Sequence, residues 1–256
     1  MFEKEIEIQT ADGVSDGFFY HPDGTGPWPG VLHLTDIGGI REVSRQISKQ
    51  LVSLGYAVLM PNVFYRTAKP PLWAFQRSGD EKSKKRFQEL ASPLTPDAVE
   101  RDSTPYIDFL AKQDGVKQAP FGIAGYCITG GIALRMAAAH PEKIAAVTSF
   151  HAGGLFTDAP TSPHLVLPRV KARLYFGHAE EDYSMPKEAI EKFERGLAAW
   201  GGQYESETYA GAHHGWTMSD GSAYNEPQAE RALAKLAELF AATLGGKNAS
   251  GAARSA

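Results

Sequence analysis

The chain has 256 residues, of which 43% are hydrophobic and 22% are charged, and its formal net charge is -4. This composition is ordinary for a globular protein, and it gives no electrostatic reason to expect nucleic acid as a partner. No run approaches the roughly 18 apolar residues that span a bilayer, and the start MFEKEIEIQT lacks the apolar core of a signal peptide. The single cysteine, Cys127, excludes an internal disulfide framework and a multi-cysteine metal site. We therefore expect a cytoplasmic protein that binds neither nucleic acid nor membrane, because a free thiol stays reduced in the cytoplasm.

The first third of the chain predicts a hairpin followed by a strand–helix–strand unit. EIEIQT (5–10) alternates with period two, and the turn at Asp12-Gly13 leads into SDGFFYHP, which favours an antiparallel hairpin at a sheet edge. VLHL (31–34) and YAVLMP (56–61) are short apolar runs typical of buried strands. Between them, Val43, Ile47 and Leu51 have the spacing of one helix face, which Gly55 ends.

The remaining sequence repeats this alternation of strands and helices. Four further strands are predicted at 121–126, 145–150, 173–177 and 203–209. Four further helices are predicted at 97–112, 130–139, 186–200 and 227–244. Such alternation is typical of an α/β fold with a mostly parallel central sheet and helices on both faces. We expect one domain over 1–245, followed by a disordered tail, 246–256, of small and polar residues.

Residues 65–96 interrupt this rhythm with two adjacent prolines, several aromatic residues and many charges. The segment follows a strand, and open parallel sheets bind ligands where their strands end. Two interpretations remain open: a lid or pocket wall, and a helical excursion that only packs on the domain.

Cys127 lies in the stretch GYCITGG (125–131), between an apolar strand and a predicted helix. A residue on such a sharp turn exposes its side chain above the sheet, and small neighbours allow strand and helix to approach closely. The helix N-terminus also favours a thiolate and offers a free N–H to an oxyanion. The pattern therefore favours a nucleophile over a structural cysteine.

A thiol nucleophile needs a base, and the base needs an acid that orients it. Asp182 follows the strand RLYFG, with Glu180 and Glu181 as rival acids, and His213 and His214 follow the strand QYESETY. Nucleophile, acid and histidine thus occur in the order expected for this fold, past the ends of neighbouring strands. The sequence therefore predicts a catalytic triad. These patterns alone do not decide between His213 and His214 as its base.

Together these motifs resemble the dienelactone hydrolase family of α/β-hydrolases over roughly residues 6–240. The resemblance rests on GYC (125–127), the FG…D run that ends at Asp182, and HGW (214–216). It extends to LTDIGGIR (34–41), GYAVLMPN (55–62) and AYNEPQAERA (223–232).

The resemblance implies the α/β-hydrolase fold and hydrolysis of an ester, lactone or similar acyl compound through a thioester. It implies that Cys127 attacks the carbonyl, that His214 moves the proton, and that Asp182 orients the imidazole. The backbone N–H groups of Ile37 and Ile128 would form the oxyanion hole. The expected partner is a small-molecule acyl substrate, with no cofactor.

The chain departs from the family pattern at three positions near the expected site. Thr129 replaces the first glycine after GYC-x, and Asp36 stands where the family usually has glutamate near the cysteine. Met218 stands where the family member acting on dienelactone has an arginine matched to the substrate carboxylate. A neutral or larger acyl substrate is therefore expected in place of a small anionic lactone.

Other residues are candidates for lining the site on weaker grounds. His151 follows a strand on the same edge, and Tyr126 precedes the nucleophile. Tyr65, Arg66 and Trp73 belong to the 65–96 segment. For each of them a packing role is the alternative.

The metal motif HExxH and the phosphate-binding motif GxxxxGK[ST] are both missing from the sequence, and glycine-rich turns alone do not indicate a dinucleotide site. Two alternative functions use the same features: a catalytically silent protein that binds a small ligand, and an acyltransferase with the same triad. The sequence leaves the oligomeric state open.

Overall fold

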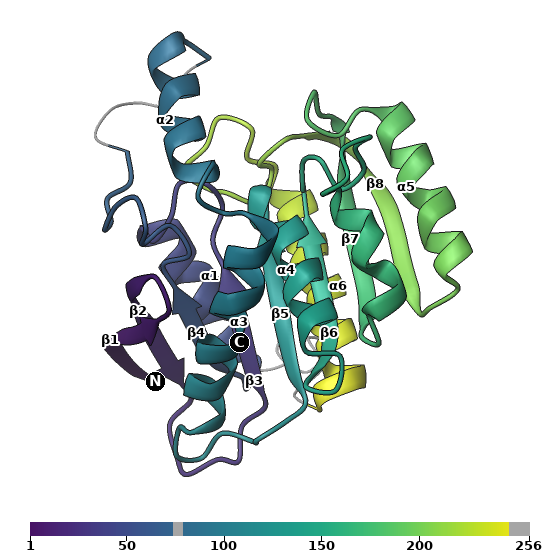
Figure 1. Ribbon diagram of the computed structural model, residues 1–256. Coiled ribbons are helices and arrows are strands. Elements are labelled where there is room, and N and C mark those ends of the chain that lie inside the picture. The colour runs from purple at the N-terminus through teal and green to yellow at the C-terminus, as the bar shows by residue number, and fades with distance from the viewer. Residues whose placement is uncertain (74–78, 246–256) are drawn as a thin grey trace.

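An eight-stranded sheet forms the centre of the computed structural model, which describes residues 1–73 and 79–245 (Figure 1). The strand order across the sheet is β1-β2-β4-β3-β5-β6-β7-β8. The strands are β1 (Phe2–Thr10), β2 (Gly13–His21), β3 (Gly30–Leu34), β4 (Ala57–Pro61), β5 (Phe121–Tyr126), β6 (Ile144–Phe150), β7 (Arg173–Glu181) and β8 (Tyr204–His213).

The N-terminal hairpin is antiparallel, as predicted, and the sheet beyond it is parallel. Thr10 pairs with Gly13 across the turn, where Gly13 has a φ of 145° that a side chain would disfavour. Strand β2 also runs antiparallel to β4, whereas all pairings from β4 to β8 are parallel. The carboxyl ends of β3 to β8 therefore meet at one edge of the sheet, where open parallel sheets bind ligands.

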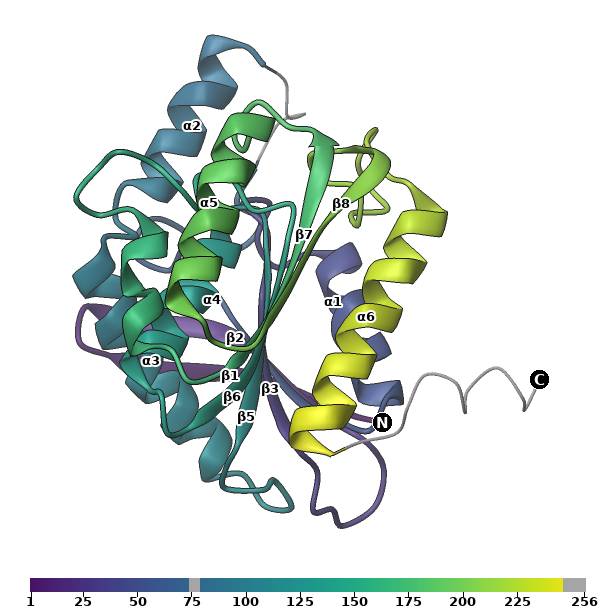
Figure 2. The same ribbon diagram turned by 90° about the vertical axis from the view of Figure 1, so that its right-hand side faces the viewer.

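Helices cover both faces of the sheet (Figure 2). The helices are α1 (Glu42–Ser53), α2 (Glu81–Ala91), α3 (Pro96–Ala111), α4 (Ile128–Ala139), α5 (Lys187–Trp200) and α6 (Glu226–Leu244). Helices α1 and α6 lie on one face, and α3, α4 and α5 lie on the other (Figure 2). The predicted α/β-hydrolase architecture is confirmed.

Two hydrophobic clusters fill the spaces between the sheet and its helices. Successive residues of a strand point to opposite faces, so Leu32 and Ile123 join the cluster on the side of α3 and α4. Their neighbours Val31 and Ala124 join the cluster beneath α1 and α6. Because both faces are covered, the central strands are continuous apolar runs and not alternating ones.

The structure differs from the prediction mainly in two longer strands and one additional short helix. Strands β7 and β8 run past the predicted ends to Glu181 and His213, because they continue to pair beyond a register shift. A short 3-10 helix, Pro163–Arg169, was not predicted, and the predicted tail 246–256 lies outside the described residues. None of the described helices is both long and apolar enough to cross a membrane.

Candidate active site

Cys127 occupies a strained turn between β5 and α4. Its φ of 57° and ψ of -129° are unusual for a residue with a side chain. Gly125 is needed for this turn, because a Cβ there would lie 2.6 Å from the carbonyl oxygen of Thr129. A Cβ on Gly130 would likewise meet the Ser149 hydroxyl at 2.3 Å. These glycines, and the strain they permit, hold the thiol at the carboxyl edge of the sheet.

Thr129 supports this turn with its side chain. It is fully buried, and its hydroxyl accepts a hydrogen bond from the Tyr126 N–H at 2.9 Å. The same oxygen lies 2.9 Å from the carbonyl oxygen of Leu34, at the end of β3, and 2.9 Å from that of Tyr126. The room for helix and strand to approach comes from Gly125 and Gly130, so the threonine links two strand ends.

His214 bridges the cysteine and an acid. Its Nε2 lies 3.2 Å from the Cys127 Sγ, and its Nδ1 lies 2.6 Å from Oδ2 of Asp182. Burial opposes protonation of the imidazole, but the hydrogen bond with Asp182 and the interactions with the Cys127 sulfur outweigh it and raise the pKa of His214 to about 10. His213 points to a different acid, Glu181, at 3.3 Å.

Asp182 is held by a residue that the sequence analysis missed. The N–H and the hydroxyl of Ser184 both donate to its Oδ1, at 2.8 and 2.5 Å, and the hydroxyl lies 3.3 Å from Nδ1 of His214. Burial alone would raise the pKa of Asp182, but the bonds from His214 and Ser184 lower it below its usual range. The spacing Asp-x-Ser, which favours such a turn, was the available signal.

Two backbone N–H groups, one directly after Cys127 and one after β3, have no hydrogen-bond partner among the residues that the structure describes. Ile128 is the first residue of α4, where an N–H has no acceptor within the helix. Ile37 follows β3, and no hydrogen bond within the described residues takes up its N–H either. These are the two donors expected for the oxyanion hole.

The loop that carries Ile37 is packed from outside by the segment after β4. The Trp73 indole N–H donates to the Ile37 carbonyl oxygen at 3.1 Å. Gly39, with a φ of 72°, lies against Leu72, whose Cδ1 would be 2.3 Å from an added Cβ. In turn, Arg86 of α2 donates to the Leu72 carbonyl oxygen at 2.9 Å. The described part of the 65–96 segment thus contacts the loop that carries Ile37 directly.

Asp36 is engaged by an arginine. Both of its oxygens accept hydrogen bonds from the Arg41 guanidinium, and Oδ1 also accepts from the Gly38 N–H at 3.1 Å. The guanidinium also binds Asp220, on the loop that follows His214. Its pairing with these acids, opposed by burial, raises the pKa of Arg41.

His151 contacts the triad but is held neutral. Its ring lies edge-on to that of His214, with centroids 5.3 Å apart, and its Nε2 lies 2.7 Å from the Thr217 hydroxyl. Burial, with the nearby His214 charge, lowers the pKa of His151 to about 3. It has a φ of 41°, and its Nδ1 has no partner within the described residues.

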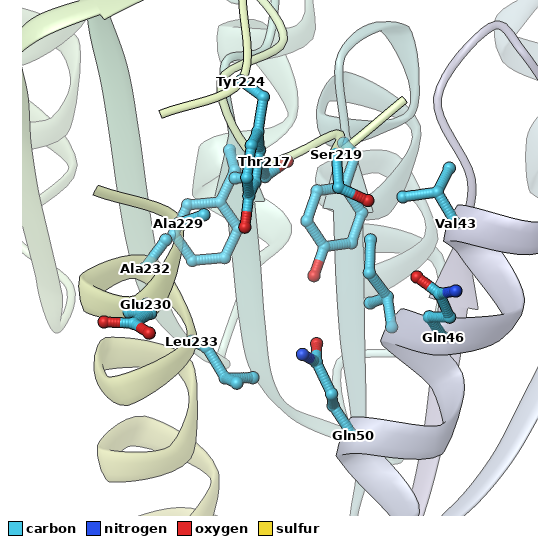
Figure 3. A pocket seen from close by; sticks show the side chains of 13 residues that line it. Val43, Gln46, Gln50, Thr217, Ser219, Tyr224, Ala229, Glu230, Ala232 and Leu233 are labelled. Carbon is cyan, nitrogen blue, oxygen red and sulfur yellow. The ribbon is translucent and has the colours of Figure 1, made fainter. Parts of the chain in front are cut away.

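Tyr126 and Met218 face the side of α1 and α6 and pack in that cluster. Tyr126 lines a cavity of about 100 Å³ between these helices, beneath the loop that carries Thr217 and Ser219 (Figure 3). Cys127 joins the cluster on the other face. The structure therefore places the side chains of Tyr126 and Cys127 on opposite sides of the sheet.

Tyr65 and Arg66 are held in a network of hydrogen bonds and ion pairs with Asp12 and Asp102. Arg66 donates to both oxygens of Asp102, at 2.7 and 2.9 Å, and to Asp12. The Tyr65 hydroxyl donates to Asp102 at 2.9 Å and accepts from Thr10. These contacts favour the packing alternative for both residues. Within the described ranges, no group of three or more His, Cys, Asp or Glu side chains could hold a metal ion.

This fold, with a cysteine on the strained turn and a histidine and an acid beside it, defines the α/β-hydrolase class. The family model "Dienelactone hydrolase family" matches residues 15–244. The chain therefore belongs to the dienelactone hydrolase family, and by class it is an ester or lactone hydrolase.

Individual relatives agree with this assignment. Carboxymethylenebutenolidase of Rhodococcus opacus is 28% identical over 193 residues, which cover 74% of this chain and 71% of that protein. The structure of dienelactone hydrolase from Anabaena variabilis matches with a TM-score of 0.67 at 20% identity, over 95% of this chain and 98% of that one. A dienelactone hydrolase-like promiscuous phosphotriesterase from metagenomic libraries matches with a TM-score of 0.74 at 17% identity, over 95% of this chain and 99% of that one. These structural likenesses concern the fold.

Proposed function

We propose that the chain hydrolyses an uncharged carboxylic ester or lactone through a thioester on Cys127. The observation that carries the proposal is the line of contacts from the sulfur to His214, at 3.2 Å, and from His214 to Asp182, at 2.6 Å. The strained turn at Cys127 supports the same chemistry, as do the N–H groups of Ile37 and Ile128, which have no acceptor among the described residues.

In the proposed reaction, the Cys127 sulfur attacks the carbonyl carbon after its proton has passed to Nε2 of His214. The negative charge on the carbonyl oxygen is stabilised by the N–H groups of Ile37 and Ile128. Collapse of this intermediate expels the alcohol, which takes the proton from His214, and leaves the thioester. Water then attacks the thioester and gives its proton to His214, which returns it to the sulfur as the acid leaves. Asp182 keeps the imidazole oriented throughout.

The proposed preference for an uncharged substrate rests on Arg41 and Met218. Arg41 is neutralised by Asp36 and Asp220, so its charge is not free to bind a carboxylate. Met218, where a relative carries an arginine, is apolar and buried. A substrate carboxylate would therefore lose its hydration without gaining an ion pair.

Matched esters test both parts of the proposal. We expect p-nitrophenyl butyrate to be hydrolysed with a kcat/KM at least about tenfold above that of the anionic mono-p-nitrophenyl succinate. Iodoacetamide should abolish turnover, and Cys127→Ala should remove it. The control is Arg45→Met on α1, where the arginine binds Glu3; this variant should keep the wild-type turnover. Full activity of Cys127→Ala would refute the thioester mechanism.

The same assay separates the alternatives. Saturable ester binding without turnover would indicate a silent binding protein, and faster p-nitrophenol release with added alcohol, with formation of a new ester, would indicate an acyltransferase. The cytoplasmic location stays an expectation that follows from the free cysteine.

A further inference from the structure

Arg41 joins the loop that carries one oxyanion donor to the loop that carries the catalytic histidine. On one side it binds Asp36, immediately before Ile37, and the Gly39 carbonyl oxygen at 3.2 Å. On the other side it binds Asp220, six residues after His214, through Nε at 2.6 Å and Nη2 at 3.1 Å. Asp36 lies 5 residues from Arg41 in the sequence, whereas Asp220 lies 179 residues from it.

The guanidinium is fully used by these contacts. An arginine has five N–H donors, and the structure provides five acceptors: two oxygens of Asp36, two of Asp220 and one carbonyl. The Arg41 side chain is 20% exposed, and that of Asp36 is 6% exposed. A planar fork with paired carboxylates on two sides fixes both loops more rigidly than a lysine could.

We infer that Arg41 is a positioning residue that sets the oxyanion donor of Ile37 at its working distance from the Cys127–His214 pair. The inference rests on the proposed function and extends it. A donor stabilises the developing oxyanion only when it is held in place before the reaction, and loss of one such donor costs on the order of a hundredfold in kcat. Gly38 makes the contact possible, because an added Cβ there would lie 2.4 Å from Nη1 of Arg41.

Two chemical readouts distinguish positioning from mere stability. Ester turnover needs the oxyanion hole, whereas alkylation of Cys127 by iodoacetamide needs only the nucleophile and its base. In Arg41→Met we expect kcat for p-nitrophenyl butyrate to fall about 10- to 100-fold, with KM within about threefold and the alkylation rate within about twofold. Arg41→Lys and Asp220→Asn should give intermediate losses, because each keeps part of the network.

The double variant Asp36→Asn/Arg41→Met controls for folding. It removes both charges of the buried pair, and asparagine can still accept from Gly38, so thermal stability should recover relative to Arg41→Met while kcat does not. Arg45→Met, the same change one turn later on α1, should leave kcat unchanged. An unchanged kcat in Arg41→Met, or equal losses in kcat and alkylation, would overturn the inference.

Hydrogen exchange keeps this test separate from the proposed function. If the wild type hydrolyses no ester, the proposed function fails. The exchange of the amides of residues 36–41 then still reports whether Arg41 holds this loop in place. Faster exchange of that segment in Arg41→Met, and not in Arg45→Met, would support the positioning role of Arg41. Unchanged exchange in Arg41→Met would overturn that role.

Discussion

Thr129 replaces a glycine of the family pattern, and its hydroxyl carries out a definite task. It bonds the Tyr126 N–H and lies against the carbonyl oxygens of Leu34 and Tyr126, in a place without exposure to solvent. A residue that departs from the family pattern is thus one of the supports of the turn. Propensity and spacing could not predict this, because the partners come from two different strands.

Replacement of Thr129 tests this role. Thr129→Val keeps the shape but leaves the buried Tyr126 N–H without its partner, so we expect the free energy of unfolding to fall by about 1–3 kcal/mol. Thr129→Ser keeps the hydroxyl and should lose less. Urea unfolding measures both, and a larger loss in Thr129→Ser than in Thr129→Val would assign the effect to packing of the methyl group instead.

The raised pKa of His214 predicts how stability depends on pH. The pKa is about 10 in the folded protein and 6.5 in an unfolded chain, so protonation of this imidazole favours the folded state. The contribution is fully present below pH 6.5 and is lost as the pH rises towards 10. The difference in unfolding free energy between wild type and His214→Gln should therefore shrink from pH 6 to pH 10. A difference that grows over this range would contradict the assignment of the charge.

At the scale of elements, the site depends on how closely α4 approaches β5. Gly125 faces the backbone of the first turn of α4, at a separation that excludes a Cβ. A Cβ on Gly131, within α4, would meet side-chain atoms of Pro163 and Leu155, at 3.2 Å or more. The two glycines therefore differ in function although they lie in one motif.

These two glycines provide a matched pair of variants. Gly125→Ala should push α4 away from β5 and lower kcat at least about tenfold, because a misplacement of about 1 Å can cost a hundredfold. Gly131→Ala should keep kcat within about twofold, since alanine favours a helix interior by about 1 kcal/mol over glycine. Steady-state kinetics on p-nitrophenyl butyrate decides, and full activity of Gly125→Ala would refute the close-approach argument.

Across the whole molecule, the ion network of Asp12, Arg66 and Asp102 joins distant parts of the chain. It connects the turn of the N-terminal hairpin, the loop after β4 and helix α3. The Asp102 side chain is 4% exposed, so its oxygens are bonded by these partners and not by bulk water. The network holds the edge of the sheet. Among the described residues, its members share no hydrogen bond or ion pair with Cys127, His214 or Asp182.

Loss of Asp102 should therefore affect stability and not turnover. We expect Asp102→Asn to lower the free energy of unfolding by about 2 kcal/mol, less than the roughly 3–5 kcal/mol for a lone buried pair, because Asp12 still pairs with Arg66. The value of kcat for folded protein should stay within about twofold of the wild type. A large loss of kcat at unchanged stability would return Arg66 to the list of residues that act on substrate.

The architecture was predictable from sequence to a large extent, and the reasons are physical. Buried parallel strands are continuous apolar runs, and helix faces repeat every three to four residues, so local patterns disclose both. Such patterns predict Cys127, an acid and a histidine, because each comes just after a strand, whereas the choice of Asp182 and His214 over their neighbours came from the family resemblance. Contacts that depend on side-chain geometry between distant segments, such as those of Arg41 and Ser184, leave no comparable periodic signal.

The single cysteine has a consequence for the response to oxidants. A sulfenic acid formed on Cys127 would find no second thiol in this sequence with which to close an internal disulfide. Recovery would then require an external thiol small enough to reach Cys127, which is 9% exposed, in competition with irreversible over-oxidation. The rate of ester turnover in this protein would thereby follow the supply of small reducing thiols around it.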